Sequence, residues 1–121
     1  MYVDDLVSLQ QSWIAQLTSQ GLDVVDRLRV ERGEYVYVVS CELEPDEDME
    51  IGNYCRGYIT TVAMTRTPET VAQKIESAYV ALRNQAVAAV VMRNLRWQME
   101  PAVADYFTVV CELELTWVSA S

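Results

Sequence analysis

Two pairs of glutamates have the residue type and spacing for acid–base or metal chemistry. Glu42 and Glu44, and later Glu112 and Glu114, stand at alternate positions of the same tetrapeptide, Cys-Glu-Leu-Glu. Two carboxylates act as general acid and general base when burial pushes their pKa values apart. Alternate positions of a strand share one face, and these glutamates occupy the polar phase. We therefore expect them on an exposed sheet face and predict no enzymatic activity.

If the two Cys-Glu-Leu-Glu strands are neighbours, the four glutamates would cluster on that exposed face. Like charges on adjacent strands repel one another. A partner protein or ring packing over this face would relieve the repulsion better than open solvent. We therefore regard Glu112 and Glu114 as candidate partner-contact residues.

The remaining residue inventory excludes the common catalytic centres. The chain has no histidine, and its three cysteines lack Cys-x-x-Cys spacing, which excludes a histidine-based triad and argues against a zinc site. It also lacks the Walker loop, GxGxxG, GxSxG and HExxH motifs. Cys41 and Cys111 lie on the apolar phase of predicted strands, where a free thiol behaves as a small buried hydrophobe. We expect no cofactor, no metal and a reducing compartment.

The most acidic stretch is residues 45–53, Pro-Asp-Glu-Asp-Met-Glu-Ile-Gly-Asn. Its proline, charges and glycine favour a loop. A calcium loop of the EF-hand type needs ligands at fixed spacing, ending in a bidentate glutamate, and that order is absent. A solvated or partner-facing loop is the better interpretation. Its candidate contact residues are Asp46, Glu47, Asp48 and Glu50.

Length and charge limit the class of protein. At 121 residues the chain fits a single domain, 1–121. The formal net charge is −9 and the nine Lys and Arg residues are scattered, so the basic stripe of a nucleic-acid binder is absent. No apolar run reaches the roughly 20 residues of a membrane helix, and the start does not resemble a secretory signal. We expect a soluble protein made in the cytoplasm, without a membrane partner.

A strand near the end of the chain is the element around which the others must be arranged. From Tyr106 to Val118, apolar and polar side chains alternate for about six repeats, which is typical of a strand with one face on a core. Such strands belong to antiparallel sheets covered on one side. The sequence must therefore supply partner strands and amphipathic helices.

Two helices are predicted. The first spans about Val3 to Ser19, with Gly21 as its stop. The second covers Pro68 to Arg83, with Thr67 as N-cap, and a second piece could extend it to about Val91. Leu22 to Arg32 is either a short strand or an extended linker.

Three further strands precede the last one. Tyr35 to Glu44 is rich in Val and Tyr, and its period places Tyr37, Val39, Cys41 and Leu43 on one face. Tyr54 to Thr65 follows, where Gly57 indicates a bulge or a close backbone approach. The third contains Leu95, Trp97 and Met99, stops at Pro101, and is joined to the last strand by Ala102 to Asp105.

The elements together predict an α+β fold. Their order is α-(β)-β-β-α-β-β, and the simplest closed arrangement is an antiparallel sheet of about four strands with two helices packed on one face. The tyrosines and tryptophans recur at strand spacing. We predict that they are core or interface residues and not a platform on which nucleic-acid bases stack.

This order of elements is similar to that of the phage tail terminator, or tail completion, family. The resemblance is carried by the passage from Arg56-Gly57-Tyr58 through Thr67-Pro68-Glu69 to the helical run at residues 78–82, and by the closing strand Tyr106 to Val118. It spans most of the chain but contains no diagnostic motif.

The resemblance implies a structural virion protein. Members of the family form homohexameric rings that cap the tail tube and join it to the head connector, with DNA passing through the channel without specific binding. The implied partners are further copies of this chain, a tail tube protein and a head–tail connector protein. Alternatives are another head–tail adaptor, a minor tail protein, or an acidic inhibitor that mimics DNA.

Overall fold

The computed structural model describes residues 2–25, 34–45, 54–84 and 91–118. Its elements follow the order helix, two strands, helix, two strands, so the predicted α+β fold is confirmed. In chain order they are α1 (Tyr2–Ser19), β1 (Tyr35–Pro45), β2 (Tyr54–Thr65), α2 (Pro68–Arg83), β3 (Val91–Val103) and β4 (Tyr106–Val118).

The four strands form one antiparallel sheet in the order β1-β2-β4-β3. β1 and β2 are joined in sequence and pair directly, and so do β3 and β4. α2 connects β2 to β3, and β4 lies between these two strands. The alternating strand β4 is thus a central strand with partners on both sides, which is what its long apolar face predicts.

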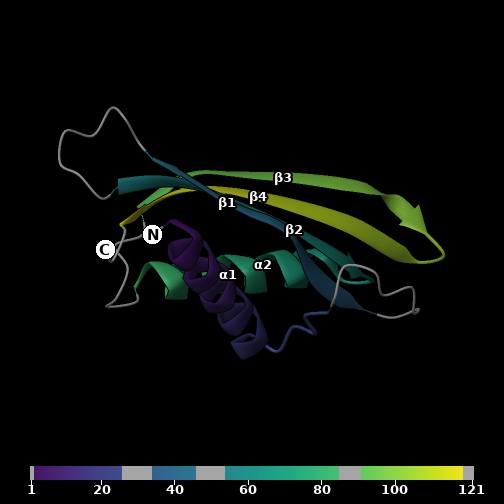
Figure 1. The fold of residues 1–121 in the computed structure, drawn as a ribbon. Coiled ribbons are helices and arrows are strands. Elements are labelled where there is room, and N and C mark those ends of the chain that lie inside the picture. The colour runs from purple at the N-terminus through teal and green to yellow at the C-terminus, as the bar shows by residue number, and fades with distance from the viewer. Residues whose placement is uncertain (1, 26–33, 46–53, 85–90, 119–121) are drawn as a thin grey trace.

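Both helices lie on the same face of the sheet (Figure 1). α1 contacts β1 and α2, while α2 contacts β2 and β4. Helix-facing side chains of the strands and the inner stripes of the helices form one core. Its fully buried members include Leu9, Trp13, Leu17, Ile59, Ile75, Ala78, Tyr79, Leu82, Leu113 and Leu115.

The helix ends explain why the predicted boundaries hold. Gly21 has φ +81°, a conformation that glycine adopts without strain, and its N–H donates to the carbonyl of Thr18 (2.9 Å). At the start of α2, Pro68 occupies the first turn as predicted. Thr67 is the N-cap residue, but its side chain makes no cap hydrogen bond. Its N–H instead donates to Oγ1 of Thr65 (2.9 Å).

The predicted face of β1 is wrong over its first half. The register with β2 shifts between Val38 and Ser40, so one extra residue lies in β1 at this point. A shift of one residue transfers every later side chain to the opposite face. Tyr37 therefore lies opposite Val62, away from the helices, whereas Cys41 lies opposite buried Ile59.

The predicted end of β3 is also wrong, because the strand continues through Pro101 to Val103. β3 is an edge strand, where a residue without an N–H is tolerated, and the register with β4 shifts between Glu100 and Val103. The connection to β4 shrinks to Ala104 and Asp105, with φ 51° and 71°. Positive φ at both residues is typical of a two-residue type I′ hairpin.

Three smaller predictions are settled by the backbone. Val24 forms a single parallel bridge with Val36, so residues 22–25 are an extended segment; residues 26–33 lie outside the described part of the chain. Val91 belongs to β3 and not to a helix, and residues 85–90 are likewise not described. Gly57 marks a close approach, because a Cβ there would lie 2.6 Å from Cδ1 of Leu115.

Candidate functional site

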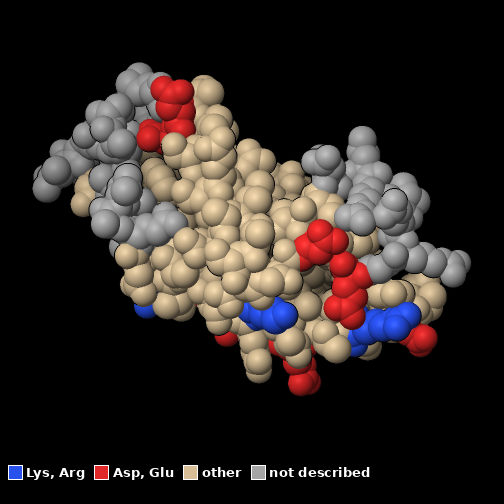
Figure 2. Space-filling model, turned by 90° about the horizontal axis from the view of Figure 1, so that it is seen from below, with Lys and Arg blue, Asp and Glu red and all other residues tan. Residues whose placement is uncertain are grey.

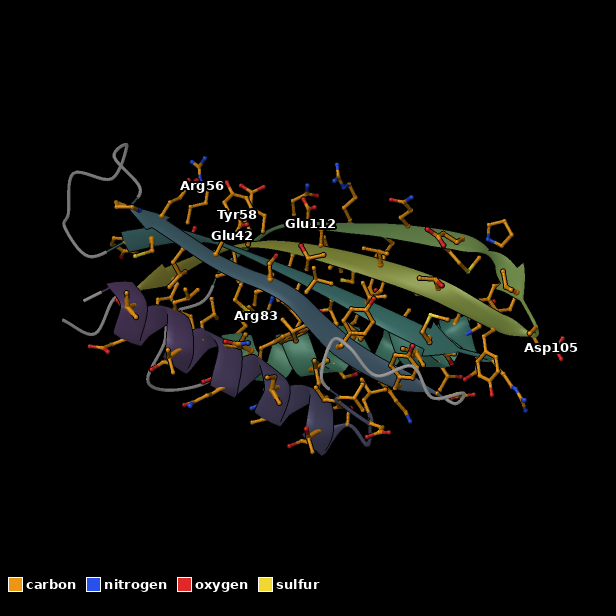
Figure 3. All side chains as sticks on the ribbon, turned by 45° about the vertical axis from the view of Figure 1, so that its right-hand side comes forward. Glu42, Arg56, Tyr58, Arg83, Asp105 and Glu112 are labelled. Atoms are coloured by element: carbon orange, nitrogen blue, oxygen red, sulfur yellow. The ribbon has the colours of Figure 1, made fainter. Side chains whose placement is uncertain are left out.

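The four glutamates share the outer face of the sheet, but they do not form one cluster. β2 lies between β1 and β4, so the two Cys-Glu-Leu-Glu segments are not neighbours. Tyr58 separates Glu42 from Glu114 in the same cross-strand row. Figure 3 shows Glu42, Tyr58 and Glu112 rising from the face opposite the helices.

Polar partners are interleaved with these carboxylates. The Tyr58 hydroxyl donates to Oε1 of Glu44 (3.3 Å), and Arg96 donates to Oε2 of Glu112 (3.2 Å). The Arg96 and Glu112 side chains are 71% and 43% exposed, so this ion pair contributes little to stability. None of the four glutamates is buried, and this face offers them no desolvated acid–base pair.

The predicted partner-contact residues fall into two groups. Glu112 and Glu114 are half-buried on the outer face of β4. Asp46, Glu47, Asp48 and Glu50 lie outside the described residues. That these acidic residues contact a partner therefore stays a prediction.

At the other end of the outer face, β1 and β2 carry aromatic and apolar side chains, which the strand periods did not reveal. The rings of Tyr35 and Tyr37 stack with centroids 6.1 Å apart. Next to them Val62 is only 7% exposed, although neither helix lies on this side. The reason is the extra residue in β1, which places both tyrosines on the face that carries Val62 and Met64.

The thiols are not activated for chemistry. Burial raises the pKa of Cys41 to about 11 and that of Cys111 to about 12; Glu76 and Glu112 add to the second shift. Burial, with a smaller contribution from Asp5, also raises the pKa of Cys55. A raised pKa depletes the nucleophilic thiolate. Within the described ranges, no three His, Cys, Asp or Glu residues lie together as a metal site.

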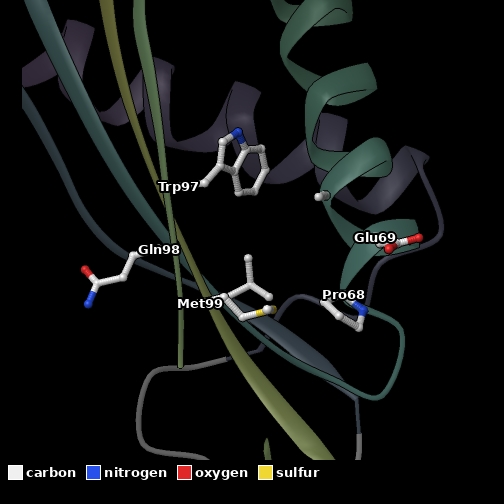
Figure 4. Close-up of a pocket in the computed structure, with 7 residues that line it drawn as sticks. Pro68, Glu69, Trp97, Gln98 and Met99 are labelled. Atoms are coloured by element: carbon white, nitrogen blue, oxygen red, sulfur yellow. The ribbon is translucent and has the colours of Figure 1, made fainter. Parts of the chain in front are cut away.

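An open groove lies on the helix side, between the start of α2 and the edge strand β3. It has a volume of about 350 Å³ and is lined by Pro68, Glu69, Ala72, Trp97, Gln98, Met99 and Val109. Figure 4 shows Trp97 and Met99 on the groove side of β3 and Gln98 pointing the opposite way. Trp97 is half-buried and Met99 is 56% exposed.

The groove exists because the helices stop short of β3. α1 and α2 have their main sheet contacts with β1, β2 and β4, which leaves the inner side chains of β3 partly uncovered. Seen from the helix side in Figure 2, broad uncharged areas separate the charged groups. An exposed apolar strip beside an edge strand is typical of a protein interaction surface.

Among the described residues, the opposite edge of the sheet, β1, is covered only at its start. The N–H of Val36 donates to the carbonyl of Asp23 (2.8 Å), and its carbonyl accepts from Val25 (2.9 Å). No described residue pairs with the outer side of β1 beyond this bridge. Nor does any described residue pair with the outer side of β3. Within the part of the chain that the structure describes, the sheet therefore has two open edges, one on β1 and one on β3.

The fold and these surfaces define a small α+β protein with a half-covered antiparallel sheet. No protein-family model matches the chain, and no curated protein sequence matches it. Among the described residues, no helix combines the length and apolar character needed to cross a membrane.

Two solved structures show partial likeness. The type 4 fimbrial biogenesis protein PilO from Pseudomonas aeruginosa is 10% identical with a TM-score of 0.43, over 91% of this chain and 66% of that chain. A protein from Akkermansia muciniphila is 8% identical with a TM-score of 0.43, over 96% of this chain and 76% of that one. This chain thus spans about two thirds of PilO, and no functional conclusion follows at this level of likeness.

Proposed function

We propose that this chain is a structural virion protein of the tail terminator type. In this role, copies of the chain form a ring that caps the tail tube and joins it to the head connector. The observation that carries the proposal is the pair of open edges on β1 and β3, the latter backed by the groove at Trp97 and Met99. A subunit with two different open edges is suited to a head-to-tail ring.

The charge of the chain supports a passive channel. Its formal net charge of −9 would repel the phosphate backbone of DNA moving through a ring. The same charge is the basis of the alternative, an inhibitor that mimics DNA. The outer face favours the ring, because Arg56 and Arg96 are interleaved there with the glutamates.

The test is to image the purified protein by negative stain, alone and mixed with the tail tube protein encoded in the same genome. Rings with a central hole, either free or at the ends of tubes, support the proposal. A chain that stays monomeric in both samples overturns it. Competition with DNA for a nuclease by such a monomer would establish the mimic instead.

A further inference from the structure

The strand register shows which backbone groups point outward from β1. In an antiparallel ladder each residue directs its N–H and C=O to one side, and successive residues alternate. Val36 uses both groups for the bonds to residues 23–25, so its β2 partner Ala63 directs its own groups to β4. Every second residue of β2 does the same. Cys41 and Leu43, which lie opposite such residues, therefore point their backbone groups away from the sheet.

The same rule applies to β3. Ala63 bonds to its partner Val109 on β4, so Val109 turns its backbone groups away from β3. Met99 lies opposite Val109 and therefore directs its N–H and C=O to the free edge. Trp97 and Leu95 follow at two-residue steps.

The residues with outward backbone groups also carry the uncovered apolar side chains. On β3, Leu95 and Trp97 are half-buried and Met99 is exposed. On β1, Cys41 and Leu43 are half-buried. Among the described residues, both edges thus present backbone groups that no other strand pairs with, and apolar side chains on the helix side of the sheet.

We propose that these two edges bind each other in neighbouring copies of this chain. β3 of one copy pairs antiparallel with β1 of the next, with Trp97 opposite Cys41 and Arg96 opposite Glu42. This inference rests on the proposed function, because it specifies the contact by which the ring closes. β1 and β3 run antiparallel within one sheet, so a copy placed beside another in the same orientation joins the edges and keeps all helices on one side.

Charge complementarity favours a second copy of this chain as the partner that binds the β3 edge. Arg96 is 71% exposed and has Glu112 on its β4 side. In the proposed register, Glu42 of the next copy stands on its other side, on the same outer face. Arg96 would then lie between two carboxylates, a favourable cross-strand arrangement. Exposed Glu42 would gain a cation.

The segments of β1 and β3 that remain available for pairing support the same register. The bridge to Val24 occupies the start of β1, and Pro45 at its end lacks an N–H. β3 pairs regularly with β4 only from Asn94 to Glu100, between two register shifts. The resulting pairs are Asn94 with Glu44, Leu95 with Leu43, Arg96 with Glu42, Trp97 with Cys41, and Gln98 with Ser40.

Disulfide trapping tests the register. In a hydrogen-bonded antiparallel pair the Cα atoms are about 5.5 Å apart, within the roughly 4.4–6.8 Å that a disulfide spans. Trp97→Cys is treated with copper phenanthroline, which takes up the two electrons of disulfide formation, at the highest soluble protein concentration. Its new thiol should then link to native Cys41 of the next copy. Each copy has one thiol at each edge, so a ladder of linked oligomers is expected on a non-reducing gel. Peptide mapping identifies the bond.

Two controls make the trapping result specific. Met99→Cys places the thiol two residues along β3, where it should link to Cys41 at least about tenfold more slowly because a thiol two residues out of register lies roughly 7–8 Å away. Trp97→Cys combined with Cys41→Ser should give no ladder. A link in that double variant indicates pairing of β3 with β3 of a second copy. No ladder with Trp97→Cys, or equal linkage with Met99→Cys, also overturns the proposed register.

A charge exchange tests the same contact without cysteine. Arg96→Glu and Glu42→Arg should each weaken self-association by about tenfold, since an attraction becomes a repulsion. An equimolar mixture of the two variants should regain wild-type association, because alternating copies restore opposite charges at every junction. Association that is unchanged in the single variants, or not regained in the mixture, overturns the proposal.

The outcomes separate this contact from the proposed function. A disulfide ladder without binding to tail tubes supports the edge pairing and overturns the terminator role. Rings on tubes without the link to Cys41 support the terminator role and overturn the edge pairing.

Discussion

Trp13 on α1 and Thr61 on β2 share a hydrogen bond inside the core. The indole Nε1 donates to Oγ1 of Thr61 at 3.0 Å, and both residues are fully buried. The bond joins the first helix to a central strand that lies 48 positions away in the sequence. Burying an indole N–H without a partner costs free energy, so this bond favours the observed position of α1 on the sheet.

We predict that Thr61→Val destabilises the protein by about 1–3 kcal/mol. Valine has a similar shape but no acceptor, so the indole N–H of Trp13 would remain buried and unsatisfied. Urea unfolding followed by tryptophan fluorescence measures the loss. Thr60→Val, at the neighbouring outer-face position, is the matched control and should change stability by less than about 0.5 kcal/mol. Equal effects of the two variants would show that the buried bond is not important.

Gly57 permits β2 to pack under Leu115 and Leu43. A Cβ at this position would lie 2.6 Å from Cδ1 of Leu115 and 3.2 Å from Cδ2 of Leu43. We therefore predict that Gly57→Ala lowers the free energy of unfolding by about 1–3 kcal/mol through overpacking. Denaturant unfolding of both proteins measures the difference.

A second-site variant tests the cause of that loss. Leu115→Val removes the atom nearest to the new methyl group, so it should cost less in the Gly57→Ala background than in the wild type. Strictly additive losses would contradict the steric explanation.

Stability should fall above pH 9.0, the ordinary pKa of an unperturbed thiol. Burial raises the pKa of Cys111 to about 12, so the folded protein holds the proton while the unfolded chain releases it. The stabilising effect is complete below the unfolded pKa and is lost as the pH rises toward the folded one. The expected slope from this thiol is about 1.4 kcal/mol per pH unit.

The matched variant for this prediction is Cys111→Ala. It should be less stable than the wild type at neutral pH because of the cavity, yet its stability should fall less steeply above pH 9.0. Chemical denaturation at a series of pH values gives both slopes. Parallel curves for wild type and variant would rule out Cys111 as a cause of the pH dependence.

Substitutions in the β3–β4 turn should raise the stability of the protein. Ala104 and Asp105 both have positive φ, which costs about 1–2 kcal/mol for an alanine. Asn-Gly is the preferred pair in a type I′ turn, so Ala104→Asn with Asp105→Gly should raise the free energy of unfolding by about 1 kcal/mol. Thermal unfolding measures the gain. The same pair placed at Thr67 and Pro68, where α2 begins, should be destabilising.

Local sequence patterns predicted most of the fold because each depends on near neighbours. The alternation from Tyr106 to Val118 identified a half-covered strand to the residue, since a period of two is fixed by the pleat. Pro68 and Gly21 marked helix ends because their φ preferences act locally. These signals also sufficed for two helices on one face of an antiparallel sheet.

The errors occurred where a distant strand decides the outcome. The face of Tyr37 depends on the extra residue by which β1 fits β2, and that residue has no signature of its own in a run of valines. Pro101 could remain in β3 only because the strand order places β3 at an edge.

The candidate interaction surface was also partly predictable from the sequence and partly dependent on the tertiary structure. The sequence by itself determined the composition, the acidic charge and the alternation that places Arg96 and Trp97 on opposite faces of their strand. Only the tertiary structure decided that β2 separates the two glutamate pairs and that the helices leave Trp97 partly uncovered. Strand order and helix placement are set by long-range packing, which no local period encodes.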